Sequence, residues 1–115
     1  MSGVAYKIVS AADWDSIQAA GGYDGSAVDL RDGYIHLSAA DQLAGTAAKH
    51  YAGRDDLRLL DVDLAPYGEA IVWEPSRGGA LFPHLYGRLS VASVGRVRAF
   101  HVRQDGEMVF EEDPA

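Results

Sequence analysis

Two segments of the chain hold most of the side chains that could do chemistry. The first, Gly-Tyr-Ile-His-Leu-Ser at residues 33–38, places His36 at the end of an apolar run and Ser38 where a helix is expected to begin. The unpaired N–H groups and positive dipole end of a helix N-terminus suit a phosphate. One interpretation is therefore a ligand phosphate with His36 beside it. The other is that His36 is a hydrogen-bonded structural histidine and Ser38 only caps the helix.

The second segment runs from Glu74 to Gly87 and mixes acidic, basic, aromatic and flexible residues without regular periodicity. Such an irregular polar stretch is typical of a binding loop. Gly78 and Gly79 allow the backbone to approach a ligand closely. Arg77 can hold a phosphate or a carboxylate through two parallel hydrogen bonds.

Three further side chains complete this segment. His84 and Tyr86 are two residues apart, so they share one face if the chain is extended there. Glu74 could act as a general base or hydrogen-bond a ribose. The alternative is a loop packed for structure, in which Arg77 pairs with Glu74 and Tyr86 is half-buried.

Hydrophobic periodicity predicts the elements that position these segments. Ser10 begins a helix that Gly21 ends, and Gly53 ends a second helix that Ser38 begins. The expected helices cover residues 11–20 and 39–51, and the expected strands cover residues 4–9, 34–37, 57–62, 70–73, 94–102 and 108–110. This order predicts an α+β fold with two helices in the N-terminal half and a mainly antiparallel sheet.

Composition limits the class of protein. The chain has 115 residues, 48% of them hydrophobic, which predicts a single globular domain over residues 1–115. It has no cysteine, no long apolar run and no signal-peptide pattern, so we expect a cytoplasmic protein that makes no membrane contact. A net charge of -7 argues against bulk nucleic-acid binding. The standard nucleotide-loop, hydrolase and metal motifs are absent from the sequence, and we expect no metal.

The two segments also resemble a known family. Residues 34–38 and 73–87, with Tyr-Lys-Ile at 6–8 and the helix carrying Trp14, are similar to the small bacterial family catalogued as domain of unknown function 952. The resemblance covers nearly the whole chain. It implies a fold like that of the ADP-ribosyltransferases, with a split, mainly antiparallel β-sheet whose cleft binds NAD.

The resemblance to these transferases is uneven along the chain. His36-Leu37-Ser38 matches the first transferase motif, which implies contact with the nicotinamide-side ribose. His84-Leu85-Tyr86 occupies the region where these enzymes usually carry a catalytic Glu. The RNA 2′-phosphotransferases of the same superfamily rely on Arg and His instead, which would direct attention to Arg77 and Arg88.

Three hypotheses follow. The first is an enzyme that binds NAD, or an ADP-ribosylated or phosphorylated nucleotide, between residues 36–38 and 74–87. The second is a non-catalytic module that binds a nucleotide or another small molecule in the same cleft. The third is a structural or interaction protein. In the first, the catalytic candidates are His36, His84 and Glu74, and the binding candidates are Ser38, Arg77, Gly78, Gly79 and Tyr86.

Overall fold

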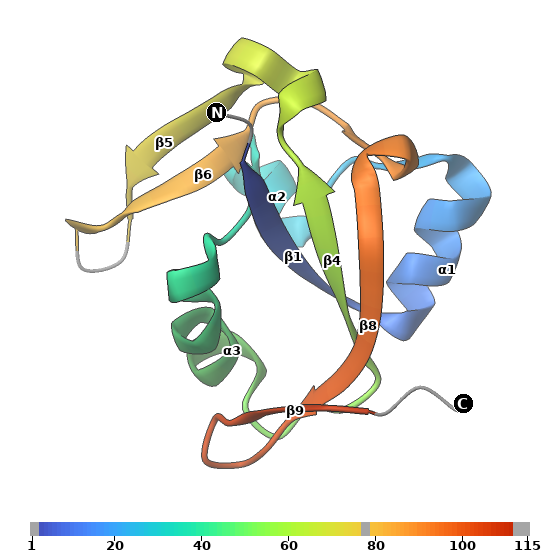
Figure 1. Ribbon diagram of the computed structural model, residues 1–115, viewed down its shortest axis with the longest axis vertical. Helices are drawn as coiled ribbons and strands as arrows, with labels where there is room; N and C mark the ends of the chain where they lie inside the picture. Colours follow the sequence, from blue (N-terminus) through green and yellow to red (C-terminus); the bar gives the residue numbers. More distant parts are fainter. Residues whose placement is uncertain (1–2, 77–78, 112–115) are drawn as a thin grey trace.

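A computed structural model describes residues 3–76 and 79–111 of the chain (Figure 1). In chain order the elements are β1 (Val4–Ser10), α1 (Ala11–Ala20), β2 (Gly22–Tyr23), α2 (Ala27–Asp32), β3 (Ile35–His36), η1 (Ala40–Gln42), α3 (Leu43–Tyr51), β4 (Leu57–Asp63), η2 (Ala65–Ala70), β5 (Ile71–Pro75), β6 (Leu81–Leu85), β7 (Leu89–Ser90), η4 (Val91–Ser93), β8 (Val94–Val102) and β9 (Met108–Phe110). The α+β class and the mainly antiparallel pairing are confirmed.

The described strands form three antiparallel sheets. The largest has the order β1-β4-β8-β9, the second β3-β6-β5, and the smallest pairs β2 with β7. The first two sheets touch at a bridge where Tyr6 and Ser38 exchange backbone hydrogen bonds of 2.8 and 2.9 Å. Away from this bridge they diverge, and Figure 1 shows the β5–β6 hairpin projecting beside the larger sheet.

The core lies on both faces of the larger sheet. Leu59 and Leu60, neighbours on β4, have no exposed surface, yet they belong to different clusters because side chains alternate along a strand. Leu59 packs with Ala47 of α3, and Leu60 packs in the cluster that contains Ile17 of α1. Figure 1 shows these two helices on opposite sides of the sheet. The sheet is therefore a fixed frame with a helix on each face.

The first predicted helix is confirmed, with its cap. α1 begins at Ala11, the Oγ of Ser10 accepts the N–H of Asp13 at 3.0 Å, and Gly21 ends the helix with φ +80°. The second prediction is right in extent but wrong in its cap. Residues 40–42 form a 3₁₀ turn before α3, and the Oε1 of Gln42 accepts the N–H of Ala39 at 2.9 Å. The side chain of Ser38 is engaged elsewhere.

A third helix, α2, adds to the two expected from the sequence. Ser26 and Asp29 cap it reciprocally, and Gly33 ends it with φ +89°. Six residues are too few to display the helical repeat of hydrophobic side chains. The sequence therefore allowed only a loop or a short helical turn there. The described part of the chain contains no helix of the length and apolar character needed to span a membrane.

The prediction that residues 74–87 are irregular is wrong. β5 and β6 form a hairpin in which Trp73 pairs with Pro83 and Glu74 with Phe82. β6 is also the central strand of its sheet, with β3 on its other edge. A proline inside a strand usually argues against a central position because it has no N–H to donate. Here the carbonyl of Pro83 accepts the N–H of Leu37 at 3.1 Å, so the strand still contributes on that side.

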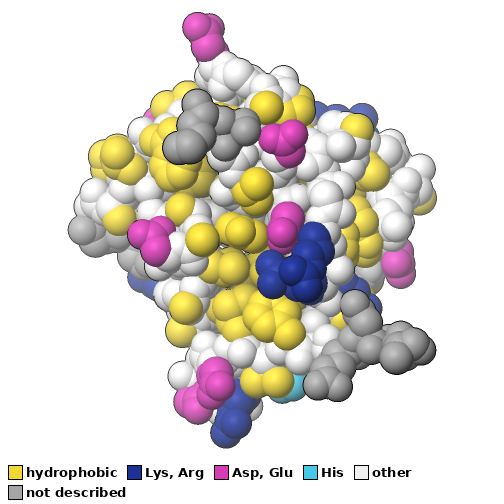
Figure 2. Space-filling view, in the orientation of Figure 1, with side chains coloured by type: hydrophobic (Ala, Val, Ile, Leu, Met, Phe, Trp, Pro, Cys, Tyr) yellow, Lys and Arg dark blue, Asp and Glu magenta, His cyan; other side chains and the backbone are white. Residues whose placement is uncertain are grey.

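The surface of the larger sheet is mixed. In the view of Figure 2, hydrophobic side chains gather beside one basic patch, and acidic side chains are scattered around them. On this sheet Arg98 of β8 pairs with Asp61 of β4 at 3.2 Å and lies over the ring of Phe110. The charge of Arg98 is thus paired within the sheet.

Candidate functional site

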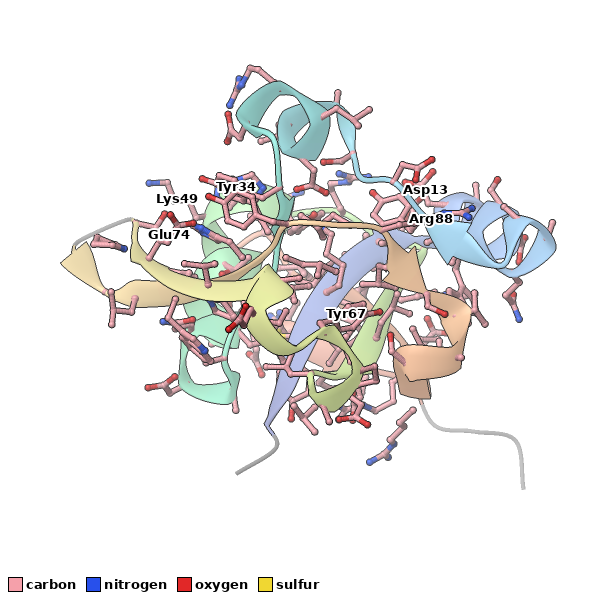
Figure 3. All side chains as sticks on the ribbon, turned by 90° about the horizontal axis from the view of Figure 1, so that it is seen from above. Asp13, Tyr34, Lys49, Tyr67, Glu74 and Arg88 are labelled. Atoms are coloured by element: carbon pink, nitrogen blue, oxygen red, sulfur yellow. The ribbon has the colours of Figure 1, made fainter. Side chains whose placement is uncertain are left out.

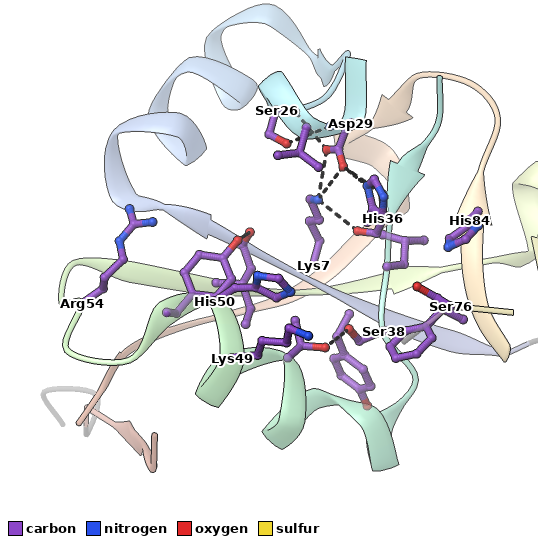
Figure 4. Close-up of a pocket in the computed structure, with 17 residues that line it drawn as sticks. Lys7, Ser26, Asp29, His36, Ser38, Lys49, His50, Arg54, Ser76 and His84 are labelled. Atoms are coloured by element: carbon purple, nitrogen blue, oxygen red, sulfur yellow. Dashed lines mark hydrogen bonds and ion pairs between the residues drawn. The ribbon is translucent and has the colours of Figure 1, made fainter. Parts of the chain in front are cut away.

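A pocket of about 530 Å³ lies beside β1, between α2 and β3 on one side and α3 on the other (Figure 4). Its size is within the range of about 300–1,000 Å³ typical of small-molecule sites. The polar residues that line it include Lys7, Asp29, His36, Ser38, Lys49 and His84. Lys7 of β1, His36 of β3 and His84 of β6 bring both of the larger sheets to this pocket.

Asp29 of α2 is the most heavily bonded carboxylate at the pocket. Its side chain is 2% exposed and accepts from Lys7 Nζ at 3.0 Å, from the Ser26 N–H at 2.9 Å and from the His36 N–H at 3.0 Å. The ring Nδ1 of His36 lies 2.6 Å from the same carboxylate. Burial opposes ionisation, but the charge of Lys7 and these hydrogen bonds outweigh it and hold the pKa of Asp29 below its ordinary value.

Lys7 is the only cation on β1 and is almost fully buried. Its Nζ also donates to the carbonyl of His36 at 3.0 Å, so it ties β1 to both α2 and β3. Burial lowers the pKa of Lys7, and the adjacent Asp29 opposes that effect. The buried ion pair is completed by hydrogen bonds on each partner, which is the arrangement that makes such burial tolerable.

His36 is held between two carboxylates. Its Nδ1 faces Asp29, and its Nε2 lies 3.0 Å from an oxygen of Asp32 at the end of α2. A neutral imidazole has one N–H, so only the protonated ring can donate to both carboxylates. The pKa of Asp32 is lowered, first by the hydrogen bond from Arg31 and then by His36. The ring of His36 is therefore held at the pocket wall by a carboxylate contact at each nitrogen.

His84 belongs to a second carboxylate–histidine pair. Its Nδ1 lies 2.8 Å from Oε1 of Glu74, and the hydroxyl of Tyr86 donates to the same oxygen at 2.7 Å. The hydrogen bonds from Tyr86 and then from His84 lower the pKa of Glu74, and in return the carboxylate raises the pKa of Tyr86 to about 12. With Nδ1–H donated to Glu74, a neutral His84 carries its lone pair on Nε2.

Tyr34 brings the two pairs together. Its ring stacks on His84 at a centroid distance of 4.0 Å and also contacts His36 at 4.7 Å and Tyr86 at 5.2 Å. The two histidines face each other directly in the β3–β6 ladder, and their ring centroids are 5.5 Å apart. Figure 3 shows Tyr34 beside Glu74. Two oriented imidazoles therefore lie side by side at this end of the pocket.

The pocket lining has a charge opposite to that of the whole chain. Among residues 3–76 and 79–111, Lys7, Lys49 and Arg54 line it, against one lining carboxylate, Asp29. The chain as a whole carries -7. A concave, locally basic site on an acidic protein favours an anionic ligand.

The structure gathers part of the predicted site. His36, Ser38 and His84 line the pocket, whereas Glu74 and Tyr86 support His84 without being among the lining residues. The Oγ of Ser38 lies 3.0 Å from the Oγ1 of Thr46 on α3.

The remaining predicted binding residues lie elsewhere. Gly79, with φ +82°, closes the hairpin turn by donating its N–H to the carbonyl of Ser76 at 2.7 Å, and it is not among the lining residues. Arg77 and Gly78 lie outside the described residues. Arg88 pairs with Asp24 at 3.3 Å, and Figure 3 shows it on the far side of the molecule from Glu74.

Several pocket residues were not found from the sequence. Lys7 gave the clearest signal, because a lysine inside an otherwise apolar strand needs a carboxylate partner if it is buried. That partner, Asp29, lies on the helix that was too short to recognise. His50, exposed in the last turn of α3, also lines the pocket together with Lys49 and Arg54. No cluster of three or more metal-ligating side chains occurs within residues 3–76 and 79–111.

Comparisons with known proteins agree with this fold. The X-ray structure of protein CC0527 from Caulobacter crescentus, a structural-genomics target, has a TM-score of 0.86 and 50% sequence identity, covering 92% of this chain and 93% of that one. The solution NMR structure of CC0527 has a TM-score of 0.79 and 51% identity, covering 90% and 89%. A search among curated proteins found no match.

The family model described as "Protein of unknown function (DUF952)" matches residues 8–97, which include both carboxylate–histidine pairs. This match extends over most of the chain, and the chain belongs to the DUF952 family.

Proposed function

We propose that this protein is an ADP-ribosyltransferase-like enzyme that binds NAD, or an ADP-ribosylated or phosphorylated nucleotide, in the pocket between the two sheets. One observation carries the proposal. Two histidines, each oriented by a carboxylate, lie side by side at the wall of a pocket where two antiparallel sheets diverge. An oriented imidazole such as that of His84 is the side chain best suited to move a proton near neutral pH.

The lining of the pocket also fits such a ligand. NAD carries a negatively charged pyrophosphate, and Lys7, Lys49 and Arg54 line the pocket. Sugar hydroxyls both donate and accept hydrogen bonds, so they suit a wall of histidine and carboxylate groups. When bound, NAD would supply the glycosidic bond between its nicotinamide and its ribose.

The residues divide into distinct roles. His84 accepts the proton of the attacking hydroxyl at Nε2, and Glu74 positions its ring through Nδ1. The ring of His36 and the hydroxyl of Ser38 orient the ribose. As the new bond forms at the ribose carbon, the bond to nicotinamide breaks and nicotinamide leaves as a neutral molecule. Tyr34 contacts both histidine rings and holds them in place, stacking on the ring of His84.

A second function is favoured by one specific contact. Both ring nitrogens of His36 face carboxylates, so this ring has no nitrogen left for proton transfer while Asp32 stays in place. A pocket in which His36 is fixed in place and transfers no proton is suited to binding without turnover. A non-catalytic nucleotide-binding module is therefore the alternative.

The test is a titration with NAD that follows thermal stability and nicotinamide release together. A ligand at a hundred times its Kd adds about 2.7 kcal/mol to the free energy of unfolding, which is visible as a higher Tm. We expect the wild-type protein to show both the shift and the release. Glu74→Gln keeps the shape of the side chain but removes its charge, and it should slow the release more than it weakens binding.

The outcomes separate the two functions. A Tm shift without release, with and without added protein or RNA as acceptor, would support the binding module instead of the enzyme. Absence of any shift with NAD, ADP-ribose or phosphorylated nucleotides would overturn both.

A further inference from the structure

We infer that the C-terminal rim of α3, formed by Lys49, His50 and Arg54 and called here the α3 rim, is the phosphate subsite of the pocket. The ligand class that follows is an elongated nucleoside diphosphate, bound with its phosphates at the α3 rim and a sugar at His36 and His84. This inference rests on the proposed function and adds the direction in which the ligand lies.

Two cations of the α3 rim, Lys49 and Arg54, form no ion pair with another described residue, although the chain has an excess of carboxylates. Arg54 is positioned by the ring of Tyr51, at 5.3 Å from the centroid. The hydroxyl of Tyr51 in turn donates to the carbonyl of Ile8 on β1 at 3.4 Å. A cation that is anchored but not neutralised is available to an anionic ligand.

Complementing the helix dipole explains only part of this arrangement. Lys49 and His50 lie in the last turn of α3, where positive charge is favourable for any helix. Arg54 lies beyond the end of the helix, yet it lines the same pocket. All three side chains therefore gather at the pocket, whereas the dipole effect would be satisfied by any orientation toward solvent.

The other end of the pocket is unsuited to phosphate. Asp29, Asp32 and Glu74 surround the rings of His36 and His84 within hydrogen-bond distance. Asp29 and Lys7 already neutralise each other there, and the negative charges of Asp32 and Glu74 disfavour a phosphate and match the hydroxyl donors of a sugar. The expectation of a phosphate beside His36 is replaced, in this inference, by a phosphate at the opposite end of α3.

The geometry sets the length of the ligand. Figure 4 shows His84 and Arg54 at opposite ends of the lining residues, with Lys49 and His50 on the α3 side between them. A single phosphate cannot reach both ends. A molecule with a sugar at one end and two phosphates toward the other can contact the histidines and the α3 rim together.

The experiment measures Kd by calorimetry for two probes, ADP-ribose and adenosine. Lys49→Ala and Arg54→Ala are compared with Arg96→Ala, an exposed cation on β8 that does not line the pocket. Loss of one charge-assisted hydrogen bond should raise the Kd for ADP-ribose about tenfold. The Kd for adenosine should not change, and Arg96→Ala should match the wild type. The charge-retaining variants Lys49→Arg and Arg54→Lys should recover most of the affinity.

The outcomes keep this inference distinct from the proposed function. Wild-type binding of ADP-ribose that is equally weakened by Arg96→Ala, or is unchanged by Lys49→Ala and Arg54→Ala, overturns the α3 rim and leaves the proposed function in place. An equal loss of adenosine binding also overturns it, because the variants would then act on the whole pocket. Failure of wild-type protein to bind ADP-ribose or NAD overturns the proposed function and the inference with it.

Discussion

The two carboxylate–histidine pairs at the pocket are built in opposite ways. In the first, the carboxylate of Asp29 is 2% exposed and the side chain of His36 is 32% exposed. In the second, His84 is 3% exposed and the carboxylate of Glu74 is 36% exposed. The carboxylate is thus the buried member of the first pair, and the histidine is the buried member of the second.

Because of this difference, the negative charge of Asp29 is fixed in place, whereas that of Glu74 can change its partners. Asp29 is held by Lys7, Ser26 and His36 at once, so its negative charge is locked into the fold. Glu74 offers one oxygen to both His84 and Tyr86 and remains open to water. A carboxylate that can exchange its partners is the better support for a histidine that gains and loses protons.

The largest expected difference between the two pairs is in stability, when each carboxylate is replaced by its amide. Asp29→Asn leaves Lys7 buried without its counter-charge, which costs about 3–5 kcal/mol of unfolding free energy. Glu74→Gln removes a charge that water already screens, and its effect on stability should be much smaller. Urea unfolding of both variants beside the wild type measures the difference.

A double variant serves as the control for that prediction. Lys7→Met with Asp29→Leu removes both charges and should recover part of the loss, because apolar side chains can replace a buried ion pair. Equal losses for Asp29→Asn and Glu74→Gln would show that the two pairs do not differ in the way described.

The buried carboxylate of Asp29 should also make the free energy of unfolding depend on pH at acid pH. Its folded-state pKa lies below the ordinary value of 3.8, so the unfolded chain binds the proton more readily. The stabilisation is fully present above that unfolded value and is lost as the pH falls through the folded one. The free energy of unfolding should therefore decrease below about pH 4, less steeply in Asp29→Asn than in the wild type. Parallel slopes for the two proteins would contradict this assignment.

The smallest effect concerns the phenol of Tyr86. Glu74 raises its pKa to about 12, first through their hydrogen bond. Glu74→Gln should bring that pKa down toward the ordinary value of about 10. Titration of tyrosinate absorbance, with Tyr86→Phe subtracted to isolate the one phenol, checks the shift. An unchanged titration would mean that the hydrogen bond to Glu74 does not persist in solution.

Much of the fold could be predicted from local signals. The run at 94–102 and the helix at 11–20 match β8 and α1 to the residue, because alternation and capping are local properties. α2 could not be predicted in the same way, because its local cap at Ser26 and Asp29 is followed by too few residues to show a helical repeat. β6 could not be predicted because Pro83 argues against a central strand. Its central position depends on pairing with β3 and β5.

The candidate site was predictable in its residue types and not in its connections. His36, Ser38 and His84 stand out as polar residues in or beside apolar runs, and the structure lines one pocket with them. The contacts that orient them depend on how neighbouring elements pack, such as the pairing of β5 with β6 that brings Glu74 to His84. Arg54 could not be assigned to the pocket because nothing local shows which way a loop cation faces.

The buried contact between Lys7, Asp29 and His36 also has a consequence for how this sequence can change over time. The three residues stand 22 and 7 positions from one another along the chain, counted from Asp29. A single substitution at Lys7 or Asp29 would leave one charge in the core, so drift at one position is penalised until the other compensates. These positions should consequently be inherited as a set. In homologues, an apolar residue at position 7 should coincide with an uncharged residue at position 29.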